Sequence, residues 1–241
     1  MKKGLFVLSL CAVLASCAHK APVADYRVVP LPQEISLMDD EAFVLTGNTS
    51  IVCQSDDDAM KSNARLLAEY VEEKTGLKLA VADEAAENAI VLSLGDVEDN
   101  AEAYKLSVGL DGVAITGASP AGVFYGIQTL RKALPVVQGG VVELPAVEIT
   151  DSPRFGYRGA HLDVSRHFFT VDSVKRFIDM LALHNMNRFH WHLTDDQGWR
   201  FEMKKYPKLN IVGTQRAQTV IGRNSGKYDG IPSGPFLYTQ D

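Results

Sequence analysis

The sequence predicts an α/β protein in two parts, a small α/β domain followed by a strand–helix–strand unit. Residues 26–150 alternate short strand-like runs with two amphipathic helical segments. Residues 151–241 open with two strand-like runs separated by one helical segment. The 241 residues are 46% hydrophobic and 22% charged, which is typical of a globular protein with a sizeable core. The formal net charge of −6, with Lys and Arg scattered, argues against nucleic acid as a partner.

The N-terminus is typical of an export signal. A short positive start precedes an apolar run, Leu5 to Leu14, that is too short to span a bilayer, and "LASC" then ends at Cys17. This pattern resembles a bacterial lipoprotein signal, residues 1–17, in which the cysteine is lipidated, and residues 18–25 would be a tether. We therefore expect an exported lipoprotein, anchored in a membrane by its lipid, in the periplasm or at the cell surface. An ordinary secretory signal is the alternative.

Two helices are predicted in the first part by their capping residues and apolar stripes. Aspartates precede the helix in "DDDAMKSNARLLAEYVEEKTG", and Gly76 stops it. In "SPAGVFYGIQTLRKALP", Ser119 is the N-cap, Pro120 takes the first helical position and Pro135 ends the helix. The apolar stripes are Met60, Ala64, Leu67 and Val71 in the first helix, and Val123, Ile127, Leu130 and Leu134 in the second.

Strands fill the remainder of the first part. "YKLSVGLDGVAITG" predicts a hairpin that turns about Asp111–Gly112, because this dipeptide suits a tight primed turn. "NAIVLSLG" predicts a further strand. No histidine lies between His19 and His161, and the charges fall on solvent-facing helix positions. We interpret residues 26–150 as an accessory domain without chemistry of its own.

The second part begins with a unit typical of parallel sheets. "RGAHLDVSRHF" predicts a buried strand that ends in polar residues, "RFHWHLT" predicts a second strand, and "TVDSVKRFIDMLALHNMN" predicts a helix between them. Thr170 is the expected cap, and Asp172 suits the positive end of the helix dipole. Short connections favour a right-handed parallel pair, the opening of a doubly wound sheet or a (β/α)₈ barrel. The apolar face of the helix is Val174, Phe177, Ile178 and Leu181.

Chemistry in both architectures lies at the carboxyl ends of the strands, here "SRH" and "TDDQGW". His190 and His192 are candidate metal ligands, because residues two apart on a strand point to the same side. A catalytic zinc site needs a third protein ligand. All six histidines lie at or before His192, so later residues supply none. We therefore expect the two rings to lie inside the fold, hydrogen-bonded to neighbours, and we predict no metal and no cofactor.

Three further residues are candidates at these ends. Asp195 and Asp196 are neighbours on an extended chain and face opposite sides, so they cannot address one site as a pair. Two interpretations remain. Either one aspartate is functional while the other caps the following turn, or both are turn residues before Gly198. Arg166 can grip vicinal hydroxyls or a carboxylate through its fork of donors, or form a salt bridge at the rim.

Two long stretches, together and in this order, resemble a known family. "DSPRFGYRGAHLDVSRHF" and "LALHNMNRFHWHLTDDQGWRFEMKKYPKL" resemble the start of the catalytic domain of glycoside hydrolase family 20, the β-N-acetylhexosaminidases. The region from "VVPLPQEI" to "VEITDSPRF" resembles the α/β domain that precedes the barrel there. The resemblance implies a small accessory α/β domain followed by the first strands and helices of a (β/α)₈ TIM barrel. It also implies that Arg166 holds sugar hydroxyls, that Asp195 supports the catalytic acid, and that Asp196 is structural.

The resemblance further implies an enzymatic activity, but this sequence lacks some of the catalytic residues that the activity requires. Family members release terminal β-linked N-acetylglucosamine or N-acetylgalactosamine from glycans by a retaining, substrate-assisted mechanism. Their catalytic Asp–Glu pair lies in an HxGGDE run, which this sequence does not contain. A (β/α)₈ barrel takes about 250 residues, so we expect residues 151–241 to be a truncated barrel and the chain to be inactive. The alternatives are a lipid-anchored sugar-binding or non-functional fragment, and a metal-dependent hydrolase built on His190 and His192.

Overall fold

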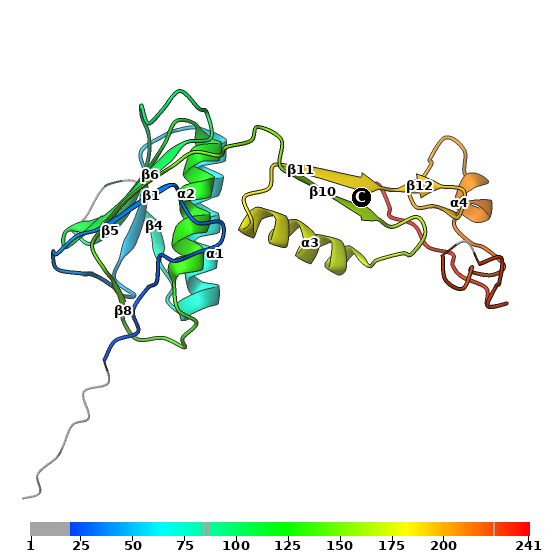
Figure 1. The fold of residues 1–241 in the computed structure, drawn as a ribbon, viewed down its shortest axis with the longest axis horizontal. Coiled ribbons are helices and arrows are strands. Elements are labelled where there is room, and N and C mark those ends of the chain that lie inside the picture. The colour runs from blue at the N-terminus through cyan, green and yellow to red at the C-terminus, as the bar shows by residue number, and fades with distance from the viewer. Residues whose placement is uncertain (1–19, 83, 85–86, 224) are drawn as a thin grey trace, which may run out of the picture.

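The computed structural model describes residues 20–241, except 83, 85, 86 and 224. The expected signal and Cys17 therefore lie outside the described residues. The described chain has two regions (Figure 1): a sheet with two helices on it, and a second region that extends away from them. None of the described helices combines the length and the apolar character needed to cross a bilayer.

A mixed sheet is the centre of the first region. Its strands are β1 (Glu34–Leu37), β3 (Ser50–Cys53), β4 (Ala80–Ala82), β5 (Ala89–Leu94), β6 (Tyr104–Gly109), β7 (Gly112–Gly117) and β9 (Val147–Asp151). Their order is β1-β9-β6-β7-β5-β3-β4, antiparallel from β1 to β7 and parallel from β7 to β4. A separate antiparallel pair is made by β2 (Phe43–Leu45) and β8 (Val142–Leu144). The small α/β domain expected from the sequence is thus present.

Both predicted helices form with their predicted caps. The first, α1 (Asp58–Thr75), begins after Asp57, whose carboxylate accepts backbone N–H groups, and ends at Gly76 in the left-handed conformation, φ 71°. The second, α2 (Pro120–Ala133), is capped by the Ser119 hydroxyl. Both lie on the same face of the sheet (Figure 1). Their predicted stripes form the core, with exposed fractions of 0% for Met60, Ala64, Leu67, Val71, Val123 and Ile127.

The hairpin between β6 and β7 turns one residue earlier than predicted. Gly109 pairs with Gly112, so Leu110 and Asp111 form the two-residue loop. Neither loop residue has a positive φ, so this is not the primed turn. Gly112 instead opens β7, where a Cβ atom would lie 2.8 Å from the carbonyl oxygen of Ala89 on β5. The glycine is needed for the close approach of two strands, not for the turn.

The second region begins with the predicted strand, helix and strand. The strands β10 (Gly159–Asp163) and β11 (Arg188–His192) pair in parallel, and α3 (Val171–Leu183) lies between them in sequence. The Thr170 hydroxyl caps α3 by accepting the N–H of Ser173. Figure 1 shows α3 along one face of the strand pair.

The prediction that β10 is a buried strand is wrong. Leu162 and Trp191 pack towards α3 around Val174, whereas His161 and His190 point to the other face and are exposed. The two strands form a sheet of their own, and in the described residues α3 and Tyr238 pack on one face of the pair. The apolar face of α3 is also covered only in part, with Val174 4% and Ile178 47% exposed.

A buried arginine organises the chain after β11. This part contains the short pair β12 (Thr194–Asp195) and β13 (Gly198–Trp199) and the single turn α4 (Leu209–Val212). Arg200 follows β13 and is only 1% exposed. Its guanidinium donates to four backbone carbonyl oxygens, those of Val164, Ser165, Thr214 and Phe236, over 2.9–3.2 Å.

Two charged contacts join the regions. Arg158, just before β10, forms a bidentate pair with Glu102 of the first region, with N–O distances of 2.8 and 3.2 Å. The Arg158 guanidinium holds the pKa of Glu102 below its usual range, although burial opposes this. Arg131 of α2 forms a second bidentate pair with Asp179 of α3, at 2.9 and 3.1 Å. The orientation of β10 and α3 against the first region therefore depends on two arginine–carboxylate forks.

Candidate active site

Arg166 and Asp195 meet where β10 and β11 end. Arg166 Nη2 lies 2.7 Å from Asp195 Oδ2, and Arg166 Nη1 lies 2.7 Å from Asp163 Oδ2. Gln197 Oε1 accepts a hydrogen bond from Arg166 Nε at 2.7 Å. The guanidinium is thus held by groups from the end of β10 and from the β12–β13 hairpin, yet the side chain is 43% exposed.

A turn closed by Asp163 directs Arg166 back across the strand ends. Asp163 Oδ1 accepts the backbone N–H groups of Ser165 and Arg166 at 3.0 and 3.1 Å. Aspartate commonly closes such turns with its own side chain. One carboxylate therefore bends the backbone with one oxygen and binds the guanidinium with the other.

The two neighbouring aspartates occupy different positions. Asp195 lies on β12, where Oδ1 accepts the N–H of Asp196 at 2.8 Å and Oδ2 lies 3.1 Å from His192 Nε2. Asp196 lies in the turn between β12 and β13. Asp195 alone of the two therefore contacts Arg166.

Hydrogen bonds and charge keep both carboxylates of the cluster ionised. The N–H of Asp196 and the charge of Arg166 hold the pKa of Asp195 below its usual range. Burial opposes ionisation of Asp163, but hydrogen bonds from Arg166 outweigh it and lower that pKa too. The hydrogen bond to Asp163 in turn raises the pKa of Arg166. The site is a cation held between two anions.

A cavity opens beside Arg166. It has a volume of about 460 Å³, and its wall includes Arg166, Asp196, Gln197, Arg216 and Tyr228. Guanidinium, carboxylate, amide and phenol groups together suit a ligand with several hydroxyls. The arrangement can therefore bind and orient a polyhydroxylated molecule.

Arg216 is a further residue of the site that the sequence did not indicate. It donates to the carbonyl oxygens of Arg166 at 2.7 Å and Gln197 at 3.0 Å, and to the Thr219 hydroxyl at 3.0 Å. These contacts tie both strand ends to the cavity wall. A single arginine in an irregular stretch carries no pattern, so only the folded chain identifies it.

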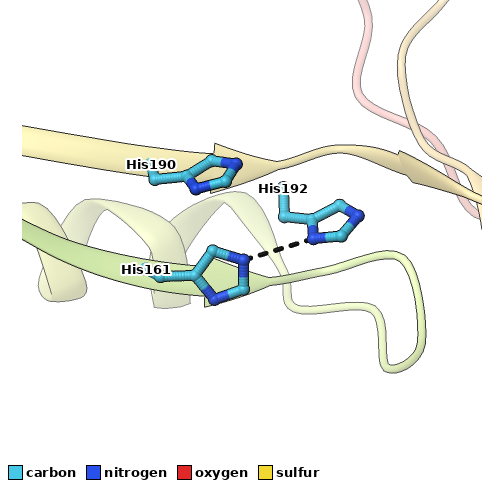
Figure 2. A group of neighbouring side chains, drawn as sticks. All are labelled: His161, His190 and His192. Carbon is cyan, nitrogen blue, oxygen red and sulfur yellow. Dashed lines mark hydrogen bonds between the residues drawn. The ribbon is translucent and has the colours of Figure 1, made fainter.

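The histidines form a cluster that includes one more residue than expected. His161 of β10 lies beside His190 and His192 of β11 (Figure 2). His161 Nε2 is 3.2 Å from His192 Nδ1, and the His161 and His190 ring centroids are 4.5 Å apart. The sequence argument looked for a third ligand only downstream of His192 and so overlooked His161, which strand pairing places beside the other two from upstream. The expectation of interior rings also fails for His190, which is exposed.

Comparison with known families accounts for both regions. Residues 25–152 match "Glycosyl hydrolase family 20, domain 2", and residues 155–241 match "Glycosyl hydrolase family 20, catalytic domain". The chain belongs to glycoside hydrolase family 20. Arg166, Asp195 and the three histidines all lie in the part that matches the catalytic domain of family 20.

Individual family-20 proteins are similar over most of this chain. A β-hexosaminidase of Porphyromonas gingivalis is 37% identical over 95% of it. The β-N-acetylhexosaminidase of Streptomyces coelicolor A3(2) superposes with a TM-score of 0.75 at 35% identity over 91% of the chain. A mutant β-hexosaminidase of Streptomyces plicatus, solved with its product GlcNAc, gives the same values. The chain spans 31% of the P. gingivalis protein and 42% and 43% of the Streptomyces chains.

Proposed function

We propose that the protein to which these residues belong is an exo-acting β-N-acetylhexosaminidase. It would remove terminal β-linked N-acetylglucosamine or N-acetylgalactosamine from glycans. Support comes from membership of family 20 and from relatives named β-hexosaminidase at 35–37% identity. The S. plicatus relative holds GlcNAc, a sugar of the proposed class.

The observation that carries the proposal is the position of Arg166. Its guanidinium lies at two strand ends, beside a cavity, and contacts Asp163, Asp195 and Gln197. Hydrogen bonds to Gln197 and Asp163 use two of the five N–H donors of the arginine, and the others remain for Asp195 and a ligand. Because the guanidinium is already fixed, little further side-chain freedom is lost when a sugar binds. We infer that Arg166 holds hydroxyls of the terminal N-acetyl sugar.

The proposed mechanism is retaining and uses the substrate as nucleophile, as in other substrate-assisted glycosidases. The 2-acetamido oxygen attacks the anomeric carbon while a glutamic acid protonates the departing oxygen. An aspartate orients the acetamide and balances the charge on its nitrogen. Asp195 would act through other groups, as a positioning residue that orients the acid, and its contacts with Arg166 and His192 suit that role.

We propose that these 241 residues carry the sugar-holding half of the site. They include no HxGGDE run, so we expect no turnover from them alone. The second candidate is a sugar-binding or non-functional fragment, which needs no catalytic Asp–Glu pair. Sequencing the coding DNA beyond codon 241 separates the two, because the enzyme requires an in-frame HxGGDE segment.

We also propose that Cys17 is lipidated and anchors the protein to a membrane after export. Support comes from the positive start, the apolar run and "LASC". Labelling cells with a fatty-acid analogue tests this directly. Wild-type protein should carry the label and the C17S variant should not, whereas label in both would exclude this anchor.

Sugar binding to the purified chain tests the role of Arg166. N-acetylglucosamine titrated into wild-type protein should perturb NMR signals around the cavity, and Arg166→Ala should abolish the effect. Arg166→Lys keeps the charge but loses the fork, so it should also weaken binding. The control is Arg176→Ala on the exposed surface of α3. Equal binding by Arg166→Ala and Arg176→Ala would refute the role.

Hydrolysis of a chromogenic N-acetylglucosaminide tests the activity. The 241-residue chain should give no turnover, whereas a version extended through an HxGGDE segment should be active. In that version Arg166→Ala should mainly raise KM. Turnover by the short chain, abolished by Asp195→Asn, would contradict the proposed division of the site.

A further inference from the structure

We propose that His161, His190 and His192 form a binding site for a divalent transition-metal ion, with Zn²⁺ as the best match. Imidazole nitrogen is a preferred zinc ligand, and three protein ligands with one open position are typical of reactive zinc sites. The candidate ligand atoms of the three rings lie within 4.8 Å of one another. This site goes beyond the proposed glycosidase function, which uses no metal.

Strand pairing brings the three rings together. His161 and His190 are direct partners in the parallel register of β10 and β11. His192 lies two residues beyond His190, so its side chain leaves the same face of the sheet. Figure 2 shows the three rings gathered over that face. The cluster is thus set by backbone geometry rather than by flexible loops.

The spacing of the nitrogens suits one ion. Tetrahedral zinc with Zn–N bonds of about 2.0–2.1 Å places its ligand nitrogens about 3.4 Å apart. His161 Nε2 and His192 Nδ1 are already 3.2 Å apart. His190 completes the set by side-chain rotation, since its ligand atom lies within 4.8 Å of the other two. In the metal-free pair one of the two facing nitrogens carries a proton. When both facing nitrogens bind the ion, that proton moves to the other nitrogen of its neutral ring.

Asp195 supplies the outer support that metal-bound histidines usually have. His192 Nε2 lies 3.1 Å from Asp195 Oδ2 and 3.2 Å from the carbonyl oxygen of Thr194. A proton on Nε2 that faces these acceptors leaves Nδ1 free to bind the ion. A carboxylate behind a histidine fixes its tautomer and strengthens it as a ligand.

Access to the site is open within these 241 residues. His161 and His190 are exposed and His192 is half-buried. An ion can therefore reach the rings directly and keep a water molecule at its fourth position. The Asp195 carboxylate also adds a negative charge beside the cluster, which favours a cation.

Cobalt spectroscopy of the purified chain tests the proposal. Co²⁺ added after EDTA treatment and dialysis should give the intense visible absorption of a tetrahedral nitrogen site, and Zn²⁺ should displace it stoichiometrically. Asp195→Asn should weaken zinc binding about 10- to 100-fold, as expected for loss of an outer-shell partner. His161→Ala and His190→Ala should weaken it more. The matched control is His184→Ala at the end of α3, outside the cluster.

Two results would overturn the proposal. One is a cobalt spectrum that stays octahedral, with no saturable zinc binding by calorimetry. The other is equal zinc affinity of His161→Ala and His184→Ala. Because a variant can fail to fold, His161→Gln is measured in parallel, and circular dichroism must match the wild type before affinities are compared.

Discussion

Arg166 is fixed by charge rather than by burial. Asp163, Asp195 and Gln197 hold its guanidinium from three directions, and Arg216 holds its backbone carbonyl oxygen. Exposed ion pairs in isolation contribute little to stability. Here several contacts converge on one planar group, so the side chain is oriented even though it stays accessible to a ligand.

The first prediction concerns pH. Folding lowers the pKa values of Asp163 and Asp195. The stability that they contribute is therefore complete above the ordinary aspartate value of about 4 and is lost as pH falls through the lowered values. Asp195→Asn should lower the thermal midpoint at about pH 7, and the difference from wild type should shrink as the pH approaches about 2.

The control for this prediction is Asp196→Asn, which removes the same charge one residue further along the chain, in the turn. It should lower the midpoint less, because Asp196 does not hold Arg166 by an ion pair in the described structure. An Asp195→Asn effect that is equally large at acid and neutral pH would contradict an ionic origin.

Between elements, the joint of the two regions depends on Glu102. Its carboxylate accepts hydrogen bonds from both terminal nitrogens of Arg158, and from the side-chain amide of Asn187 at 3.1 Å. The Tyr125 hydroxyl of α2 donates to it at 3.2 Å. This carboxylate accepts hydrogen bonds from α2, from the chain before β10 and from the residue that precedes β11. It therefore fixes the placement of the second region.

The second prediction is that Glu102→Gln destabilises this joint by about 1.5–3 kcal/mol, the usual contribution of hydrogen bonds to a charged group. The change keeps the size of the side chain but removes its charge. Urea unfolding measures the difference. Glu69→Gln, on the exposed side of α1, is the control and should be nearly neutral. Equal effects of the two changes would show that the joint does not depend on this charge.

The third prediction tests the corrected hairpin. Gly112→Ala should destabilise the first region by about 1–3 kcal/mol, because the new Cβ would lie 2.8 Å from the Ala89 carbonyl oxygen. Gly109→Ala, directly across the hairpin, meets nothing within 4 Å and should be neutral or slightly stabilising. Thermal unfolding of both variants measures this. A larger loss in Gly109→Ala would refute the assigned register.

In the whole molecule, the two regions differ in how they are held together. The first has a continuous apolar core between the sheet and both helices. The second has a small cluster centred on Val164, Val174 and Tyr238, and the carbonyl contacts of Arg200. We therefore expect the second region to open at lower free energy than the first.

The fourth prediction is that Arg200→Met loosens only the second region. It would leave three carbonyl oxygens, those of Val164, Ser165 and Phe236, without their arginine donor, whereas that of Thr214 keeps the N–H of Phe236. We expect a loss of about 2 kcal/mol or more. Native-state hydrogen exchange should then speed up in residues 193–241 and stay unchanged in α1. Uniform acceleration along the chain, or none, would show that Arg200 does not hold this region.

Sequence reasoning succeeded where the determining signals are local. The helix caps at Asp57, Ser119 and Thr170 are short motifs, and the predicted apolar stripes of α1 and α2 are buried. The parallel pair also follows from a strand–helix–strand order. These features depend on residues within one or two turns of each other.

It failed where contacts join distant segments. The hairpin loop was predicted one residue too late because Gly112 is required by the close approach of β5 and not by the turn. His161 was missed because the sequences of β10 and β11 do not reveal which of their residues pair across the helical crossover. Burial of β10 was overestimated because an apolar pattern does not say how much of a strand other elements cover. Arg200 and Arg216 carry no motif, since their partners are backbone carbonyl oxygens up to 50 residues away.

The carbonyl contacts of Arg200 have a consequence for protein synthesis. Val164 is translated well before its partner Arg200, and Phe236, 36 residues after Arg200, comes later still. While domains emerge from the ribosome N-terminal end first, the first region has time to complete its core alone. The carbonyl oxygens after β10 must wait until Arg200 and Phe236 have been synthesised, and during that interval a chaperone can bind the exposed segment.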